Sequence, residues 1–422
     1  MSTLIANPRE LLRSLFDAAV EAAQPARCLP PFLPAPPNGR TIVVGAGKAA
    51  ASMAAVVESH WAGPISGLVV TRYGHGAPCR SVEVVEAGHP VPNVAGFEAA
   101  RRMIELVEGL AEDDLVLCLL SGGGSALLTM PAAGVPLTDK QEVTRALLAC
   151  GADIHEINTV RKHLSAIKGG RLALACAPAT VHTLAISDVV GDDLAVIASG
   201  PTTPDPTTFA DARAVFRKYQ IEMPRSIDAH FDNADETPKP GDPRLPPSRS
   251  AIIANGATAL EAARQKAETL GIPAHVLSDS MTGEARAVAK QVAERIAAGP
   301  AGPQIPAEVM LGGGELTVTV TGDGEGGPNG EFLLALALEL QGAAGIHTIS
   351  CDTDGIDGSG ECAGALVGPD TLIRARALGL DLKSALARND SYGVFKALGD
   401  QIVTGPTKTN VNDFRAVLSI FD

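Results

Sequence analysis

The chain has 422 residues, of which 45% are hydrophobic and 19% charged, a globular composition that excludes a disordered polypeptide. Its formal net charge of −14 argues against general binding to nucleic acid or to an anionic membrane. The length predicts two or three domains.

Strands and helices alternate through the first half of the chain. Helices are expected over 9–23, 49–59, 96–110, 138–150 and 153–176. Strands are expected over 41–44, 67–71, 82–87, 115–120 and 181–187. Repeated strand, glycine turn and helix are typical of a parallel sheet, so the sequence predicts an α/β fold.

A proline-rich segment, 236–250, is the best candidate for a linker. Beyond it, strands are expected over 251–254 and 275–277, and 309–320 is expected to form two strands around a glycine turn. A helix over 332–341 and a strand over 347–355 follow. We therefore expect domains at 1–240 and 241–422, and leave open whether the last segment packs back on the first domain.

The seven cysteines are scattered, which predicts reduced thiols in a cytoplasmic protein. The N-terminal segment lacks the basic start and apolar core of a signal peptide. The most apolar run, 115–120, is too short to cross a bilayer. We expect a protein that acts on small molecules, without nucleic-acid or membrane partners.

Two glycine-rich turns follow expected strands. Gly45-Ala46-Gly47-Lys48 opens a helix, where backbone amides and a nearby ammonium favour a phosphate or carboxylate. The alternative is a tight turn with a solvated lysine. The string SGGGSAL (121–127) can form an anion-binding nest with two added hydroxyl groups, or can be merely a flexible connection.

A basic run, NTVRKHLSAIKGGRL (158–172), stands out in an acidic chain. On one helix Arg161 and Lys168 would share a face with Ser165 between them, and that face could hold an anionic substrate. Lys162 and His163 belong to the same run. The alternative is a solvated basic helix.

Acidic residues follow other expected strands. Asp188 could accept a hydroxyl proton or hold a magnesium ion. Asp193 could join it or simply cap the following helix. Asp354, in DTDGIDG, suits a magnesium ligand or a solvated turn.

Several strings together resemble the class II glycerate kinases, the glycerate 2-kinases with a C-terminal MOFRL domain. They are VVGAGKAAASMA, GHPVPN, LSGGGSALL, INTVRKHLSAIKGGRLA, ISDVVGDDLAVIASGPTTPDPTTF, GGGELTVTV, DTDGIDG and TGPTKTNVNDF. Some relatives carry the label hydroxypyruvate reductase. The resemblance implies a Rossmann-like, mostly parallel domain and a second α/β domain of MOFRL type with a mixed sheet.

The resemblance also implies ATP-dependent phosphorylation of D-glycerate at the 2-hydroxyl, giving 2-phosphoglycerate, with magnesium and an active site in the cleft between the domains. The catalytic candidates are Lys48, Asp188 and Arg161, and the metal candidates are Asp188, Asp193 and Asp354. The substrate and nucleotide candidates are Gly45, Gly47, Ser121, Gly122, Gly123, Gly124, Ser125, Lys162, His163, Lys168, Glu315, Asn329, Glu331, Thr404, Thr407, Asn410 and Asn412. A homodimer is left open.

One position departs from the family. Many members have a catalytic arginine where this chain has Pro328, so Arg161, Lys162 or Lys408 is expected to replace it, or the accepted acid has changed. Two other functions are considered. An NAD(P)H-dependent hydroxypyruvate reductase would use the first glycine turn but lacks the usual acidic ribose partner near Thr71 and Arg72. A non-catalytic protein that binds a sugar acid or nucleotide is the other.

Overall fold

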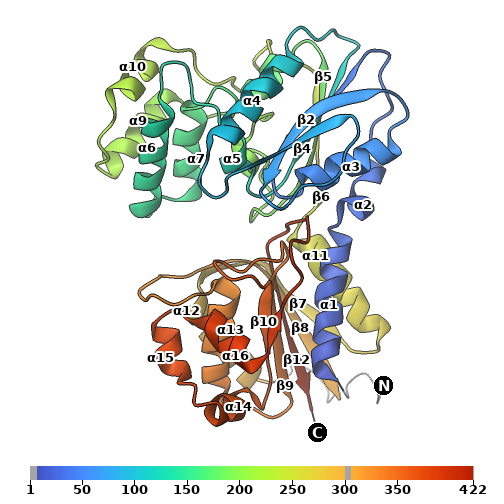
Figure 1. Ribbon diagram of the computed structural model, residues 1–422, viewed down its shortest axis with the longest axis vertical. Coiled ribbons are helices and arrows are strands. Elements are labelled where there is room, and N and C mark those ends of the chain that lie inside the picture. Colours follow the sequence, from blue (N-terminus) through green and yellow to red (C-terminus); the bar gives the residue numbers. More distant parts are fainter. Residues whose placement is uncertain (1–6, 300–305, 422) are drawn as a thin grey trace. The chain divides into compact units, whose positions relative to one another are not determined.

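The computed structural model describes residues 7–299 and 306–421. The chain forms two compact units, each built on one six-stranded sheet (Figure 1). We call Cys28–Ile253 the N-terminal unit, and Met1–Arg27 with Ala254–Asp422 the C-terminal unit. In the described part of the chain, no helix is both long and apolar enough to cross a bilayer.

The sheet of the N-terminal unit has the order β3-β2-β1-β4-β5-β6, and the pairings from β3 to β5 are all parallel. Its strands are β1 (Thr41–Ala46), β2 (Ile65–Arg72), β3 (Val82–Ala87), β4 (Leu115–Leu120), β5 (Thr180–Ile186) and β6 (Ser248–Ala254). This is the strand order of Rossmann-like sheets, which confirms the expected fold class.

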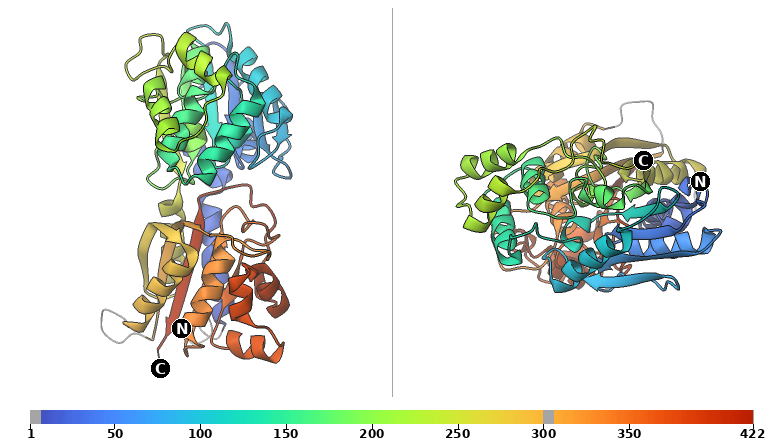
Figure 2. Two further views of the ribbon diagram at one scale, coloured as in Figure 1. Left: turned by 90° about the vertical axis from the view of Figure 1, so that its left-hand side faces the viewer. Right: turned by 90° about the horizontal axis from the view of Figure 1, so that it is seen from above.

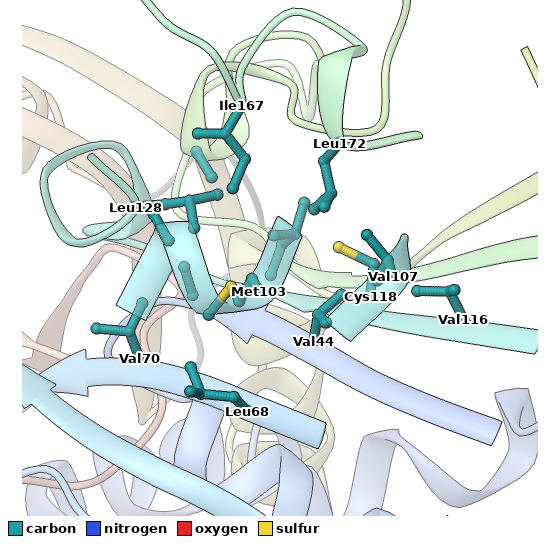
Figure 3. Close-up of a cluster of buried hydrophobic side chains, with 14 of the residues drawn as sticks. Val44, Leu68, Val70, Met103, Val107, Val116, Cys118, Leu128, Ile167 and Leu172 are labelled. Carbon is teal, nitrogen blue, oxygen red and sulfur yellow. The ribbon is translucent and has the colours of Figure 1, made fainter. Parts of the chain in front are cut away.

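Helices cover both faces of this sheet. On one face, Met103 and Val107 of α4 join a buried cluster with Val44 and Leu68 (Figure 3). Val43 points to the other face and is equally buried, and α3 packs against β1 to β4. The helices of this unit are α3 (Ala50–His60), α4 (Val94–Val107), α5 (Gly124–Leu127), α6 (Leu137–Ala149), α7 (Ile154–His163), α8 (Arg171–Cys176), α9 (Phe209–Lys218) and α10 (Arg225–Asn233).

Two expectations for this unit are corrected. The single helix expected over 153–176 is two helices, α7 and α8, because Gly169 and Gly170 take the left-handed backbone conformation between them. The strand expected to open the second domain is instead β6 of this sheet. The proline-rich segment before it is tied to the unit, since Pro238 and Pro247 accept backbone hydrogen bonds from Asp205 and Val181.

The sheet of the C-terminal unit has the order β11-β10-β9-β12-β8-β7. Only the β7–β8 pairing is parallel among the described strands of this sheet, so the expected mixed sheet is confirmed. The strands are β7 (Ala274–Glu284), β8 (Ala307–Thr317), β9 (Ile346–Asp352), β10 (Gly364–Val367), β11 (Gln401–Ile402) and β12 (Asp413–Ile420). The helices are α1 (Pro8–Ala22), α11 (Gly256–Thr269), α12 (Ala285–Ala297), α13 (Pro328–Leu340), α14 (Thr371–Ala377), α15 (Leu382–Ala387) and α16 (Ser391–Leu398).

The glycine turn expected within 309–320 is wrong, because β8 runs unbroken through Gly312 to Gly314. The absence of side chains at these glycines allows the neighbouring strand β7 to approach closely. A Cβ at Gly312 would lie 2.6 Å from the sulfur of Met281 on β7, and one at Gly314 would collide with the Met281 backbone. The glycines therefore permit the close pairing of β7 and β8.

The first helix packs in the C-terminal unit, whereas the sequence placed it in the first domain. It contacts α11, β9 and β12, and the rings of Phe16 and Phe414 lie 5.8 Å apart. Figure 2 shows α1, in blue, beside β12, in dark red. The last segment forms β12 between β9 and β8, so it stays with this unit and does not return to the N-terminal one.

Replacing Phe16 by alanine should therefore destabilise the C-terminal unit. Phe16 is fully buried, and deleting such a ring leaves a cavity that costs about 3–5 kcal/mol. Urea unfolding followed by circular dichroism measures the loss. A decrease below about 1 kcal/mol, the scale of a surface change, would contradict this packing.

Candidate active site

The two glycine-rich turns lie side by side at the carboxyl ends of β1 and β4. These strands are parallel neighbours, with Ala46 opposite Leu120. The Lys48 amide donates to the Gly122 carbonyl at 2.8 Å, and the Ala49 amide donates to Ser121 Oγ at 2.9 Å. The strand order reverses between β1 and β4, which is where open α/β sheets bind ligands.

The first turn has no amide left for an anion. The Gly47 amide donates to the Val70 carbonyl, and the next two amides donate to the second turn. A Cβ at Gly45 would collide with the Leu119 carbonyl, and one at Gly47 with Ser121 Oγ. Gly45 and Gly47 therefore allow the two turns to pack closely. What this turn offers a ligand is the half-buried Lys48 side chain.

The second turn has backbone amides that could serve the expected anion binding. In the part of the chain that the structure describes, the amides of Gly122 and Gly123 donate to no protein acceptor. Gly123 takes φ = +79°, and Ser125 Oγ lies 2.9 Å from Ser199 Oγ. Gly124 is instead a packing residue, because a Cβ there would lie 2.8 Å from that of Ala198. Two free amides beside a serine hydroxyl form a small anion cradle.

A pocket of about 380 Å³ opens beside this turn, and we call it the basic pocket. It contains four cationic side chains and no carboxylate. Its lining residues are Pro90, Val91, Pro92, Ser125, Ala126, Thr129, Leu137, Lys140, Gln141, Thr144, Arg145, Leu148, Arg161 and Lys168. The structure thus brings together Ser125, Arg161 and Lys168 from the predicted site, although α7 ends before Lys168 and the two cations do not share a helix face.

The cations of the basic pocket lack neutralising partners. Lys168 is 1% exposed, and its Nζ donates to the Ala198 carbonyl at 3.2 Å. Burial, reinforced by Lys140 and Arg161, holds the pKa of Lys168 well below its usual value, and burial also lowers the pKa of Arg161. Within 7–299 and 306–421, no carboxylate pairs with any of the three. Two buried ammonium groups beside a half-buried guanidinium are favourable for an anionic ligand.

Lys140 is a pocket residue that the sequence analysis missed. It lies on α6 with Val143 and Leu147, at spacings of three and seven residues that place all three on the buried face. A lysine in this apolar stripe was the available signal. Lys140 is 6% exposed, and burial, with Arg161 nearby, lowers the pKa of its ammonium to about 7.

Lys162 and His163 belong to another network. Lys162 Nζ lies 3.5 Å from Asp205 Oδ1, and His163 Nε2 lies 3.2 Å from Glu236 Oε2. The His163 Nδ1 contacts the Thr159 carbonyl at 2.8 Å, and burial lowers the pKa of the imidazole. Neither residue lines the basic pocket, and the contacts that the structure shows for both are those of this buried polar network.

The predicted metal ligands come from both units. Asp188 is half-buried and follows β5, the neighbour of β4. Asp193 is exposed, and its Oδ1 accepts the Ala195 amide at 2.8 Å within a turn. It does not cap the following short helix, whose N-cap residue is Val196. Asp354 is buried in the C-terminal unit, and its Oδ1 accepts the Ile356 amide at 2.7 Å. No group of three or more metal-ligating side chains occurs among the described residues.

The candidates around α13 are tied into the C-terminal unit. Asn329 Nδ2 donates to Asp413 Oδ1 at 2.7 Å, and Arg286 Nε donates to Glu331 Oε1 at 2.6 Å. Pro328 occupies the first turn of α13, where a missing amide proton costs little. Glu315 is exposed on β8.

The polar segment before β12 packs on the turn after β9. Thr407 Oγ1 donates to the Thr353 carbonyl at 2.6 Å, and the Asn412 amide donates to Asn410 Oδ1 at 3.1 Å. Thr404 Oγ1 donates to the neighbouring Gly405 carbonyl. Lys408 is half-buried with φ = +63°. These predicted ligand-binding residues share one end of the C-terminal sheet.

The Lys162 assignment can be tested by its effect on stability. Lys162→Met leaves the buried Asp205 carboxylate without its cation, which costs about 3–5 kcal/mol. Urea unfolding followed by the fluorescence of Trp61, in the same unit, measures the loss. If Lys162→Met has unchanged stability and a large loss of turnover, Lys162 acts in the active site instead.

Comparison with known proteins gives a consistent family assignment. Residues 11–232 match a domain of unknown function, DUF4147, and residues 308–413 match the MOFRL family. A protein of Agrobacterium vitis, provisionally named a hydroxypyruvate reductase, is 51% identical over 97% of this chain and 94% of its own length. The D-glycerate 2-kinase of Thermotoga maritima is 41% identical over 96% of this chain and 97% of its own.

A crystal structure of a glycerate kinase from Thermotoga maritima has the same fold. It is similar over 98% of this chain and 99% of that one, with a TM-score of 0.85 and 40% identity. The near-complete coverage extends over both units. The chain therefore belongs to the glycerate 2-kinase family with a MOFRL domain, as its motifs indicated.

Proposed function

We propose that the protein is a kinase that transfers the terminal phosphoryl group of ATP to the 2-hydroxyl of D-glycerate. The observation that carries the proposal is the basic pocket, whose buried cations lack carboxylate partners beside the free amides of Gly122 and Gly123. Phosphoryl transfer needs a cradle for phosphate, a cation at the transferring group and a held acceptor. The end of the β1–β4 pair offers a candidate for each.

The roles follow from chemistry and placement. The amides of Gly122 and Gly123 face phosphate oxygens, and the Lys48 ammonium stabilises the charge that develops on the transferring group. Arg161 binds a carboxylate or phosphate, because a guanidinium donates two parallel hydrogen bonds. In this proposal Arg161 takes the place of the family arginine that is Pro328 here.

Asp188 is the proposed acidic group, as a base for the acceptor hydroxyl or as a magnesium ligand. One carboxylate at a strand end fits a magnesium ion, which is commonly held by one or two carboxylates together with substrate phosphates. The ion would neutralise charge on the phosphates. Asp193 fits this role less well, because its carboxylate already caps a turn.

Because some relatives are named as hydroxypyruvate reductases, a reductase is the competing function. One set of assays distinguishes the kinase from the reductase. The purified protein is given ATP, magnesium and D-glycerate while ADP release is followed, and separately NADH or NADPH with hydroxypyruvate while cofactor oxidation is followed. Kinase activity predicts ADP release only. Tartronate and erythronate, tested alongside, show whether Pro328 accompanies a changed acid. Cofactor oxidation without ADP release would reject the kinase, and binding without either reaction would indicate a non-catalytic protein.

The proposed setting is the cytoplasm, with small molecules as the partners. All seven cysteines are free thiols, and burial raises the pKa values of all five buried ones, which keeps them in the unreactive thiol form.

Lys48→Ala should lower turnover while the protein stays folded. Removing one electrostatic contact to a transition state costs about 2.7–4 kcal/mol, or roughly 100- to 1,000-fold in kcat. The coupled ADP assay measures the loss, with Lys290→Ala, an exposed lysine on α12, as the matched control. Near wild-type turnover of a folded Lys48→Ala protein would reject the role.

Asp188→Asn should remove most turnover without abolishing ATP binding. Loss of a positioned base typically costs about 100- to 10,000-fold in rate, and loss of a metal ligand is similarly damaging. Magnesium titration separates the roles, because a lost ligand raises the magnesium requirement and a lost base does not. Asp17→Asn, on the exposed face of α1, is the control. Turnover within about twofold of wild type would remove Asp188 from the mechanism.

A further inference from the structure

The lining of the basic pocket includes an ammonium group that no expected role explains. Lys140 projects from α6, is 6% exposed, and its Nζ donates to the Leu164 carbonyl at 3.0 Å. Lys168, also buried, donates to the Ala198 carbonyl. An ammonium has three N–H donors, and for each lysine the described residues supply one acceptor. Both groups therefore keep donors available in the pocket that they line.

Three further cationic residues line the same pocket as Lys140, and of these Lys168 is buried, Arg161 is half-buried and Arg145 is exposed. Arg161 approaches from α7, Lys168 from the segment after it, and Arg145 from α6 itself, while Ser125 adds a hydroxyl from the glycine turn. Like charges this close repel one another, and burial removes the water that would screen them. A neutral ligand would leave that repulsion in place, whereas an anion would relieve it.

We propose that Lys140 is a ligand-contacting residue that, with Arg161 and Lys168, binds the anionic group of a substrate, either a carboxylate or a phosphate. The inference deepens the proposed function and rests on it for the choice of ligands. Glycerate supplies the carboxylate, and ATP or its product ADP supplies the phosphate. Lys140 would thereby determine specificity for charged substrates.

Anion binding through Lys140 should take up a proton. An anion favours the charged form of the ammonium, whose pKa in the free protein is about 7. Below pH 7 the group is already charged, so affinity is highest there. Above pH 7 binding must first charge it, so affinity falls as the pH rises. Burial also lowers the pKa of Lys168, with Lys140 and Arg161 adding to the effect.

The test is isothermal titration calorimetry on the whole protein between pH 6.5 and 8.5, without turnover. The probes are sulfate, D-glycerate and ADP. Sulfate and glycerate do not titrate in this range, so their pH dependence reports on the protein. Competition between sulfate and glycerate, or between sulfate and ADP, identifies the carboxylate or the phosphate as the natural anion.

Lys140→Met removes the charge and keeps the length of the side chain, and Lys140→Arg keeps a charge that does not titrate. We expect about 10- to 100-fold weaker binding of at least one probe to Lys140→Met, the scale of a lost charged hydrogen bond. Lys140→Arg should retain binding and lose the pH dependence above pH 7. Lys290→Met, with an exposed lysine, is the matched control.

The proposal is overturned if all three probes bind a folded Lys140→Met protein as they bind the wild type, or if Lys140→Arg keeps the full pH dependence. If Lys140→Met does not fold, the arginine variant alone decides. Because these measurements record binding, they remain informative if the kinase assay fails. Loss of anion binding in a protein without kinase activity would support Lys140 and reject only the proposed reaction.

Discussion

The close contact between the turns after β1 and β4 is the constraint on which the candidate site depends. Ser121 Oγ accepts the Ala49 amide, and the Gly122 carbonyl accepts the amide of Lys48. Each turn thereby fixes the other. Gly47 is the condition for this contact, because any Cβ there would occupy the position of the Ser121 hydroxyl. The pairing consumes the amides of the first turn and leaves those of the second available.

The difference between the paired amides of the first turn and the unpaired amides of the second changes how the two glycine-rich motifs are interpreted. Sequence reasoning gave both the same task, because a glycine turn before a helix favours an anion in either place. What distinguishes the two turns is which backbone amides already donate to a protein acceptor, since a buried amide must be paired and an amide that donates within the protein is not available to an anion. No local motif encodes which of the two turns donates to the other.

The strands and the family motifs could be predicted because they depend on local pattern. Runs such as 115–120 are apolar throughout and end on glycine, and a parallel sheet follows from their alternation with helices. The misses involve long-range packing. A glycine is needed at position 312 inside β8 because Met281 of another strand lies against it. The helix α1 belongs to the C-terminal unit because Phe16 packs on Phe414, which lies 398 residues later in the chain. Neither partner is visible from the segment itself.

Long-range contacts also limited the prediction of the candidate site from sequence. Arg161 and Lys168 were expected to meet on one helix, and they meet in one pocket although the helix ends between them. Lys140 was missed because a single lysine in a helix is ordinarily exposed, with its ammonium in water. Only the three-dimensional arrangement shows that its neighbours are also cations.

A pocket that holds several cations without carboxylates carries a cost in the free protein. Each ammonium loses hydration, and Lys140 and Lys168 respond with lowered pKa values, so part of the charge is given up as protons. An anionic ligand reverses this, since it restores charge to the lysines and removes the repulsion between them. Ligand binding and the stability of the N-terminal unit are therefore linked, because a ligand that binds only the folded state stabilises that state. Burying these cations therefore destabilises the ligand-free N-terminal unit, and an anionic ligand would offset that cost.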